Sequence, residues 1–239
     1  MTNRVFSEEI GGETVCIDGQ EAHHLLNVLR VRTGDAVQVF DGRGNVAETE
    51  ITSTTRRSVD LRVLSRRVVP ASRFPRITVA ASPAKGDRLR WMVEKLTELG
   101  VARLILLQTA RTIVNPGDTK LEKLHSYIVS ACKQSGRARL MELSAVTPLT
   151  HVLHDAAAAG DQIVVAHPEH IGVVRPLQFG LTGQASTLLI GPEGGFTDDE
   201  TALIAATQPQ QILWPENILR IETAAVVFAS HLMVGSYLP

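Results

Sequence analysis

The order of apolar and polar positions changes character near residue 75. Before it, short stretches alternate apolar with polar residues and are separated by turns rich in glycine, asparagine and serine. This pattern predicts strands over 37–40, 46–52 and 59–64, preceded by one amphipathic helix over 21–31. The first part of the chain therefore resembles a small barrel or sandwich of short strands.

From residue 77 onward, the pattern predicts strands that alternate with helices. Buried strands are expected at 77–81, 104–107, 163–166, 187–190 and 211–214. Helices are expected at 87–99, from 119 toward 132, from 197 to 206, and at 222–234. Such alternation is typical of a mostly parallel sheet with helices on both faces, which is an α/β fold. The proline-rich stretch at 70–75 separates the two patterns, so we expect domains at 1–72 and 73–239.

Several polar residues mark the expected helix ends. Thr119-x-x-Glu122 and Thr197-x-x-Glu200 have the spacing of capping boxes. Asp87 is expected to cap the helix that Gly100 ends.

The composition is that of an ordinary globular protein, with 44% hydrophobic and 21% charged residues. No apolar run reaches the roughly 18 residues of a membrane helix, and the first residues do not resemble a signal peptide. Cys16 and Cys132 are too few for a disulfide framework or a zinc site. We therefore expect a cytoplasmic protein that binds neither a membrane nor a metal.

The net charge of −1 conceals an uneven distribution. Residues 1–139 hold 22 Lys and Arg against 15 Asp and Glu, whereas residues 140–239 hold 2 against 10. Within the first part, residues 56–76 carry seven arginines and one acid. Such a block is typical of a surface for a polyanion, because fixed cations attract phosphates. A charged strand edge that prevents aggregation is the alternative.

The segment 187–197 has the order strand, glycine loop, capped helix. Glycines in such a loop let the backbone approach a ligand at the carboxyl end of a parallel strand. The loop lacks the spacing and the lysine of a phosphate-binding loop, and Glu193 would repel a phosphate but suits a cation such as a sulfonium or an amino group. A tight turn without a ligand is the alternative.

A second segment, 213–225, has a loop followed by a helix. Arg220 is one of two cations after residue 139 and lies in an apolar stretch, where an unpaired charge is costly. It either pairs with an acid such as Glu222 or contacts a substrate or a partner subunit. No Ser-His-Asp or Cys-His arrangement can be identified, so nothing indicates nucleophilic hydrolysis.

Taken together, these segments resemble the SPOUT superfamily of RNA methyltransferases, and within it the family that methylates N3 of a uridine in bacterial 16S ribosomal RNA. The most specific matches are LLIGPEGGFTDDE at 188–200 and ILRIETAA at 218–225. Supporting matches are HHLLNVLRVRTGD at 23–35, KGDRLRWMVEKLTELGV at 85–101 and QSGR at 134–137.

The resemblance implies an N-terminal PUA-like RNA-binding β-barrel, followed by a SPOUT α/β domain with a C-terminal trefoil knot that binds S-adenosyl-L-methionine. It also implies a homodimer that acts on 16S rRNA, within the small ribosomal subunit. By the family pattern the cofactor would contact His167, Ile190, Gly191, Pro192, Glu193, Gly194, Gly195, Leu213, Trp214, Ile218 and Leu219.

The sequence departs from the family pattern at two places. Trp214-Pro215-Glu216-Asn217 stands where the family usually has Leu-Gly-x-Arg, so an arginine is lost and a stiff proline replaces a flexible glycine. Lys133 stands where the family commonly has glutamate.

Methylation at N3 requires loss of the N3 proton, and cations near the cofactor would stabilise charge that develops on the uracil. We expect Arg220 and Arg111 in this role, and we expect RNA contacts from Arg30, Arg56, Arg57 and Arg137. Glu193 and Glu222 are the candidates for a base. The alternatives are a SPOUT enzyme acting elsewhere, such as on a tRNA ribose 2′-hydroxyl, and a non-catalytic RNA-binding or ribosome-assembly protein.

Overall fold

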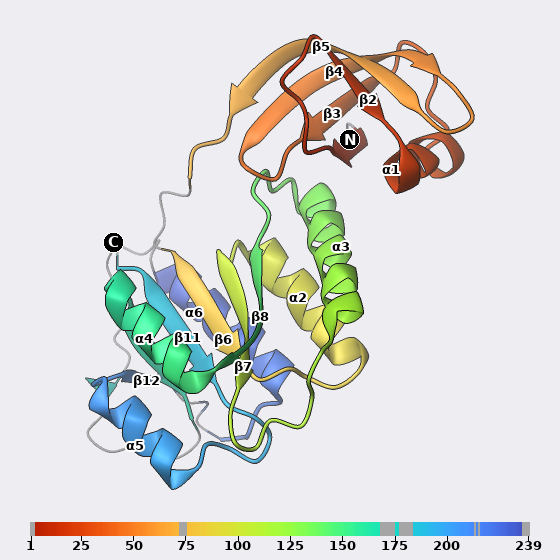
Figure 1. The fold of residues 1–239 in the computed structure, drawn as a ribbon. Coiled ribbons are helices and arrows are strands. Elements are labelled where there is room, and N and C mark those ends of the chain that lie inside the picture. Colours follow the sequence, from red (N-terminus) through yellow and green to blue (C-terminus); the bar gives the residue numbers. More distant parts are fainter. Residues whose placement is uncertain are drawn as a thin grey trace. The chain divides into compact units, whose positions relative to one another are not determined.

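The computed structural model divides the chain into two compact units, each with its own sheet (Figure 1). It describes residues 3–71, 76–167, 175–176, 184–212, 214 and 216–235. One unit comprises Met1–Ala71 with Cys132–Leu140, and the other comprises Ser72–Ala131 with Met141–Pro239. The segment 132–140 thus belongs by its contacts to the N-terminal unit, while the expected domain division at residue 72 stays a prediction.

The N-terminal unit is a curled sheet of five strands (Figure 1). In spatial order they are β1 (Asn3–Phe6), β3 (Ala36–Phe40), β4 (Asn45–Thr54), β5 (Val59–Val68) and β2 (Thr14–Ile17). β1 is parallel to β3, and the other neighbours are antiparallel. Alternate side chains point into one apolar core, as in β3, where Val37 and Val39 are fully buried. The expected strands are confirmed, with wider bounds.

The expected helix over 21–31 is helical, but it is shorter and changes type. It consists of α1 (Gly19–His23) followed by a π-helical turn, η1 (His24–Val28). The helical part buries Ala22 and Leu25 against the sheet core.

The segment 132–140 is held to the N-terminal sheet by polar contacts. The Arg4 guanidinium donates a hydrogen bond from Nη1 to the Cys132 carbonyl oxygen at 2.8 Å. Lys133 Nζ lies 2.7 Å from Glu21 Oε1, and both side chains are mostly buried. The lysine that departs from the family pattern is therefore matched by a carboxylate in this structure.

The second unit contains a sheet of seven strands whose neighbours are all parallel. In spatial order they are β10 (Arg175–Pro176), β12 (Gln210–Ile212), β9 (Gln162–Ala166), β11 (Ser186–Ile190), β6 (Ile77–Ala81), β7 (Arg103–Gln108) and β8 (Glu142–Pro148). The central strands β6 and β11 are buried at every residue, as expected for a sheet covered on both faces.

Helices cover both faces of this sheet (Figure 1). They are α2 (Asp87–Leu99), α3 (Asp118–Ser135), α4 (Leu149–Ala159), α5 (Asp198–Ala206) and α6 (Ile221–Gly235). α4 and α5 share an apolar cluster with side chains such as Leu107, Val165 and Leu189. α6 contacts β6, β11 and α2. The α/β fold expected from the sequence is thus confirmed, whereas the trefoil knot stays a prediction.

The structure corrects several expected details. Gly86 is the N-cap of α2, and Asp87 is the first residue of that helix. α3 begins at Asp118, so Thr119 lies within its first turn and does not precede the helix. β12 ends at Ile212, so Trp214 follows the strand. The strands β1, β2 and β8 and the helix α4 were not expected from the sequence pattern.

Candidate functional site

The candidate site lies at the carboxyl ends of the parallel strands. β11 and β6 are neighbours in the sheet. After β6 the chain continues to β7, toward one edge of the sheet, whereas after β11 it continues to β12, toward the opposite edge. In open α/β sheets, ligands bind where the connections diverge in this way. The glycine loop follows β11 at this point.

The glycine loop is shaped by close contacts that require glycine. A Cβ atom on Gly191 would lie 3.0 Å from the Phe196 ring, which is buried, so any larger residue would displace that ring. Gly195 has φ +71°, a conformation that residues with a side chain rarely adopt, and its N–H donates to the Pro192 carbonyl at 2.8 Å. The loop thus folds back on itself over Phe196.

The capping box expected at the start of α5 is confirmed. Thr197 Oγ1 accepts from the Glu200 N–H at 3.3 Å, and Glu200 Oε2 accepts from the Thr197 N–H at 2.9 Å. The second oxygen, Glu200 Oε1, accepts from the Ala110 N–H at 2.7 Å. One carboxylate therefore joins the end of the glycine loop to the loop after β7.

Arg111, in the loop after β7, holds the glycine loop through its backbone. Its Nη1 donates to the Gly194 carbonyl at 2.5 Å and to the Phe196 carbonyl at 3.2 Å. Since only Nη1 makes these bonds, the other guanidinium donors are still available to a ligand. Arg111 thus lies beside the glycine loop and fixes its backbone, while its expected role in charge stabilisation stays a prediction.

An ion-pair series crosses the site between α2, the glycine loop and α6. Arg88 Nη1 lies 3.4 Å from Glu193 Oε1 and 3.7 Å from Glu222 Oε1. Glu222 is buried, and its Oε2 has no hydrogen-bond partner among the described residues. The pairing expected between Arg220 and Glu222 is therefore not the one observed, because the buried carboxylate pairs with Arg88.

Arg220 precedes α6 and is exposed. Its carbonyl oxygen accepts from the Ala224 N–H at 2.8 Å, and its guanidinium forms no ion pair with the residues that the structure describes. Its charge is thus available to a ligand or a partner subunit, which is the other role that the sequence left open.

His167 follows β9 at the same edge of the sheet and faces the glycine loop. Its ring stacks on the Phe196 ring, with centroids 6.1 Å apart. Its backbone carbonyl accepts from Gln211 Nε2 at 3.0 Å, which ties the end of β9 to β12. The structure thereby brings His167 to the glycine loop, while its contact with the cofactor stays a prediction.

The other expected cofactor contacts are placed as follows. Ile190 is the buried last residue of β11. Trp214 and Ile218 follow β12 and are 47% and 83% exposed, so both present apolar surface to solvent. Leu219 is half-buried. Leu213 and Pro215 lie outside the described residues.

A small pocket of about 40 Å³ opens beside the loop after β6. It is lined by residues from four segments, among them Lys85, Arg111, Glu193 and Ile221. Arg88 and Lys85 belong to a basic cluster visible in the sequence, which gave them no role. Spacing could not reveal the role of Arg88, because its partners Glu193 and Glu222 lie more than 100 residues further along the chain.

The arginines expected to bind RNA belong to the N-terminal unit. Arg56 and Arg57 are exposed at the tip of the β4–β5 hairpin, and Arg30 is exposed after η1. Arg137 is half-buried, and burial lowers the pKa of its guanidinium, with Cys132 acting in the opposite direction. None of these four residues lines the cavity that the N-terminal unit has between the loop after β1 and the end of β5.

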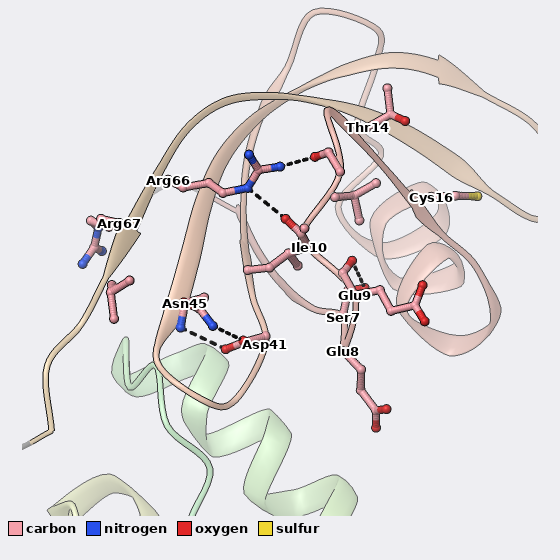
Figure 2. Close-up of a pocket in the computed structure, with 14 residues that line it drawn as sticks. Ser7, Glu8, Glu9, Ile10, Thr14, Cys16, Asp41, Asn45, Arg66 and Arg67 are labelled. Carbon is pink, nitrogen blue, oxygen red and sulfur yellow. Dashed lines mark hydrogen bonds between the residues drawn. The ribbon is translucent and has the colours of Figure 1, made fainter.

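This cavity of the N-terminal unit has a volume of about 1110 Å³ and is shown in Figure 2. Arg66 donates from Nε to the Ile10 carbonyl at 2.9 Å and from Nη2 to the Gly12 carbonyl, which fixes the loop. Asp41 accepts from Asn45, as Figure 2 also shows. The lining carries both charges, with Arg66 and Arg67 against Glu8, Glu9 and Asp41.

The comparison with known protein families decides the family. A model of the RNA methyltransferase domain matches residues 71–233, and a model of the RNA methyltransferase PUA domain matches residues 17–64. The chain belongs to this RNA methyltransferase family. The resemblance drawn from the sequence motifs is thereby confirmed, as is the PUA-like assignment of the curled N-terminal sheet.

Relatives of this RNA methyltransferase match nearly end to end. The "Ribosomal RNA small subunit methyltransferase E" of Mycobacterium bovis is 30% identical over 223 residues, which cover 90% of this chain and 84% of that protein. A probable rRNA-methyltransferase from Porphyromonas gingivalis has a similar structure, with TM-score 0.87, 28% identity and 98% of each chain covered. A putative methyltransferase from Legionella pneumophila, solved with the bound cofactor SAM, gives TM-score 0.85, 26% identity and 98% of each chain.

Within the described ranges, no group of three or more His, Cys, Asp or Glu residues is arranged to hold a metal ion. No described helix is long and apolar enough to cross a membrane.

Proposed function

We propose that this protein transfers a methyl group from S-adenosyl-L-methionine to N3 of a uridine in 16S rRNA. The observation that carries the proposal is the glycine loop after β11, held by Arg111 and packed over Phe196 and His167. The similar protein from Legionella pneumophila is solved with SAM, and the similar protein from Mycobacterium bovis is named as a methyltransferase of small-subunit ribosomal RNA.

The residues at the site fit this cofactor. The packing of Gly191 against Phe196 fixes the path of the loop backbone, Glu193 favours a cation over a phosphate, and the exposed Trp214 and Ile218 offer apolar surface to an adenine ring. We assign the cofactor to His167, the loop Ile190–Gly195, Leu213, Trp214, Ile218 and Leu219. When bound, it supplies an activated methyl group, so the protein contributes mainly position and electrostatics.

Arg220 and Arg111 are the residues that we assign to charge stabilisation on the uracil. Both are exposed, and Arg111 has guanidinium donors beyond its Nη1 contacts to the loop. Arg30, Arg56, Arg57 and Arg137 would contact the RNA from the N-terminal unit. The proposal includes domains at 1–72 and 73–239, a homodimer, a cytoplasmic location and the small ribosomal subunit as the setting.

The decisive experiment is transfer of labelled methyl groups to small-subunit RNA, free and assembled in the subunit, followed by mass mapping of the modified nucleoside. We expect 3-methyluridine. Label in a ribose or in tRNA would instead support a SPOUT enzyme of another specificity. If calorimetry detected no cofactor binding at millimolar concentration, a non-catalytic RNA-binding protein would be favoured.

The role of Arg220 has its own test. Arg220→Ala should lower the single-turnover rate at saturating RNA and cofactor roughly 100-fold, the effect of removing one preorganised charge-stabilising donor. An unchanged rate would remove Arg220 from the chemistry.

A further inference from the structure

Three charged side chains at the site form a series from buried to exposed. The exposed fraction of the side chain is 8% for Glu222, 31% for Arg88 and 57% for Glu193. The same nitrogen, Arg88 Nη1, contacts both carboxylates, and it meets only Oε1 of Glu193. The outer carboxylate therefore keeps Oε2 for another partner.

The buried end of the series fixes the position of Arg88. A buried carboxylate is costly without a counter-ion, and Arg88 is the cation that Glu222 contacts among the described residues. Glu222 Oε2 accepts no hydrogen bond from the part of the chain that the structure describes, so the ion pair with Arg88 is the main compensation there for its burial. The contact with the buried Glu222 therefore fixes the position of Arg88, and Arg88 in turn orients the more exposed Glu193.

Glu193 lines the small pocket together with Lys85 and Arg111. A carboxylate oxygen is an acceptor, whereas lysine and arginine are donors only. The lining of the pocket thereby includes one acceptor and two donors. The edge of uracil that carries N3 has the complementary set of groups, one N–H donor and two carbonyl acceptors. Cytosine has an unprotonated nitrogen at this position, which a carboxylate would repel.

We propose that Glu193 accepts the N3 proton of the target uridine and that Arg88 is the positioning residue that orients it. This inference rests on the proposed function. As the bond from N3 to the methyl carbon forms, the carbon–sulfur bond breaks, its electron pair stays on sulfur, and the N3 proton moves to Glu193 Oε2. Because the Glu193 side chain is 57% exposed, the proton then passes to solvent.

The pH dependence of single-turnover methylation tests the proton transfer. With Glu193 as the acceptor, the wild-type rate does not depend on spontaneous ionisation of uracil, so it should change little between about pH 6 and pH 8. Glu193→Gln cannot accept the proton and should lower the rate at pH 7 roughly 100-fold or more. Its rate should then rise about tenfold per pH unit, because only spontaneously ionised uracil reacts. Glu98→Gln, in an exposed pair with Lys95 on α2, is the matched control and should behave as wild type.

RNA with 5-fluorouridine at the target gives an independent reading. Fluorine makes the N3 proton more acidic, so this RNA should partly rescue Glu193→Gln and change the wild-type rate little. The inference would be overturned if the single-turnover rates of the wild type and of Glu193→Gln changed with pH in the same way. A variant whose only defect is weaker cofactor binding would overturn it as well, since Glu193 would then contact the cofactor without taking part in proton transfer.

Arg88 is tested by its dependence on Glu193. Arg88→Ala should lower the rate at saturating RNA about tenfold, Arg88→Lys should restore part of it, and Arg88→Ala should add little to Glu193→Gln. Independent, additive losses would contradict a positioning role.

Mapping the methyl group separates the two proposals. Methylation of another atom overturns both, whereas methylation at N3 with the same pH dependence in wild type and Glu193→Gln overturns only the role of Glu193.

Discussion

Single residues at the site carry more than one contact each. Arg111 fixes two backbone carbonyls of the glycine loop, and Glu200 caps α5 while it holds the Ala110 amide. Gly191 leaves no room for a Cβ beside Phe196. A substitution at any of these positions therefore alters the loop that we assign to the cofactor, even where the residue itself does not touch the ligand.

Asp41 is the residue whose ionisation should couple to the stability of the N-terminal unit. It is 7% exposed. Burial acts to raise its pKa, but hydrogen bonds from the Asn45 side chain and from the N–H groups of Arg43 and Asn45 lower the pKa below the ordinary value. A lowered folded-state pKa means that the stabilisation is present above the unfolded pKa of about 3.9 and is lost as the pH falls through the folded-state pKa.

We therefore expect Asp41→Ala to lower the free energy of unfolding at pH 7 by about 1–3 kcal/mol, since buried donors lose their acceptor. In urea unfolding from pH 7 to pH 2, the difference between the variant and the wild type should shrink only in the most acidic part of the range. Asp35→Ala, at an exposed turn, is the control. A constant difference down to pH 2 would contradict the assigned pKa direction.

At this scale, sequence reasoning found the residues whose partners lie close along the chain. The box of Thr197 and Glu200 spans one helical turn, and its spacing alone predicted it. Arg88 was missed because its partners come from two distant segments that only the sheet brings together. For the same reason, the sequence suggested Glu222, two residues away, as a partner of Arg220, whereas the Glu222 carboxylate pairs with Arg88 of α2.

At the scale of elements, periodicity predicted the strands and helices with strong apolar patterns. The buried strands β6 and β11 and the helix α2 were predicted within one residue. β8 was missed because it has no fully buried position, so its sequence lacks the apolar run that marks the central strands. The π-helical turn η1 was missed because the same apolar spacing suits an α-helix.

The two roles of Glu200 can be separated by comparing substitutions at the start of α5. Thr197→Ala removes the N-cap and should cost about 1 kcal/mol in the free energy of unfolding. Glu200→Ala removes in addition the acceptor of the Ala110 N–H. We expect faster hydrogen exchange of the Ala110 amide in Glu200→Ala, but not in Thr197→Ala. Equal exchange in the two variants would show that Glu200 does not hold the loop after β7.

At the scale of the whole molecule, the division of charge follows the chain rather than the two units. The N-terminal unit holds 12 Lys and Arg against 10 Asp and Glu, whereas residues 72–131, in the second unit, hold 10 against 5. Most of the acidic excess lies in the part of the chain that forms β8 to α6. An attraction of the N-terminal unit for RNA would therefore come from its local block of arginines at 56–67 rather than from its net charge.

The salt dependence of RNA binding tests the role of these arginines. Arg56 and Arg57 are exposed at a hairpin tip, and neither has an ion pair with a described residue. Each phosphate contact contributes about 0.7 to 0.9 to the slope of log K against log salt concentration. The double substitution Arg56→Ala with Arg57→Ala should therefore reduce the magnitude of the slope by about 1.4 to 1.8 and leave cofactor affinity unchanged. The control is Arg90→Ala, since Arg90 already pairs with Glu94 on α2. An unaltered slope in the double variant would show that the hairpin tip does not contact phosphate, and the arginine block would then be a charged strand edge.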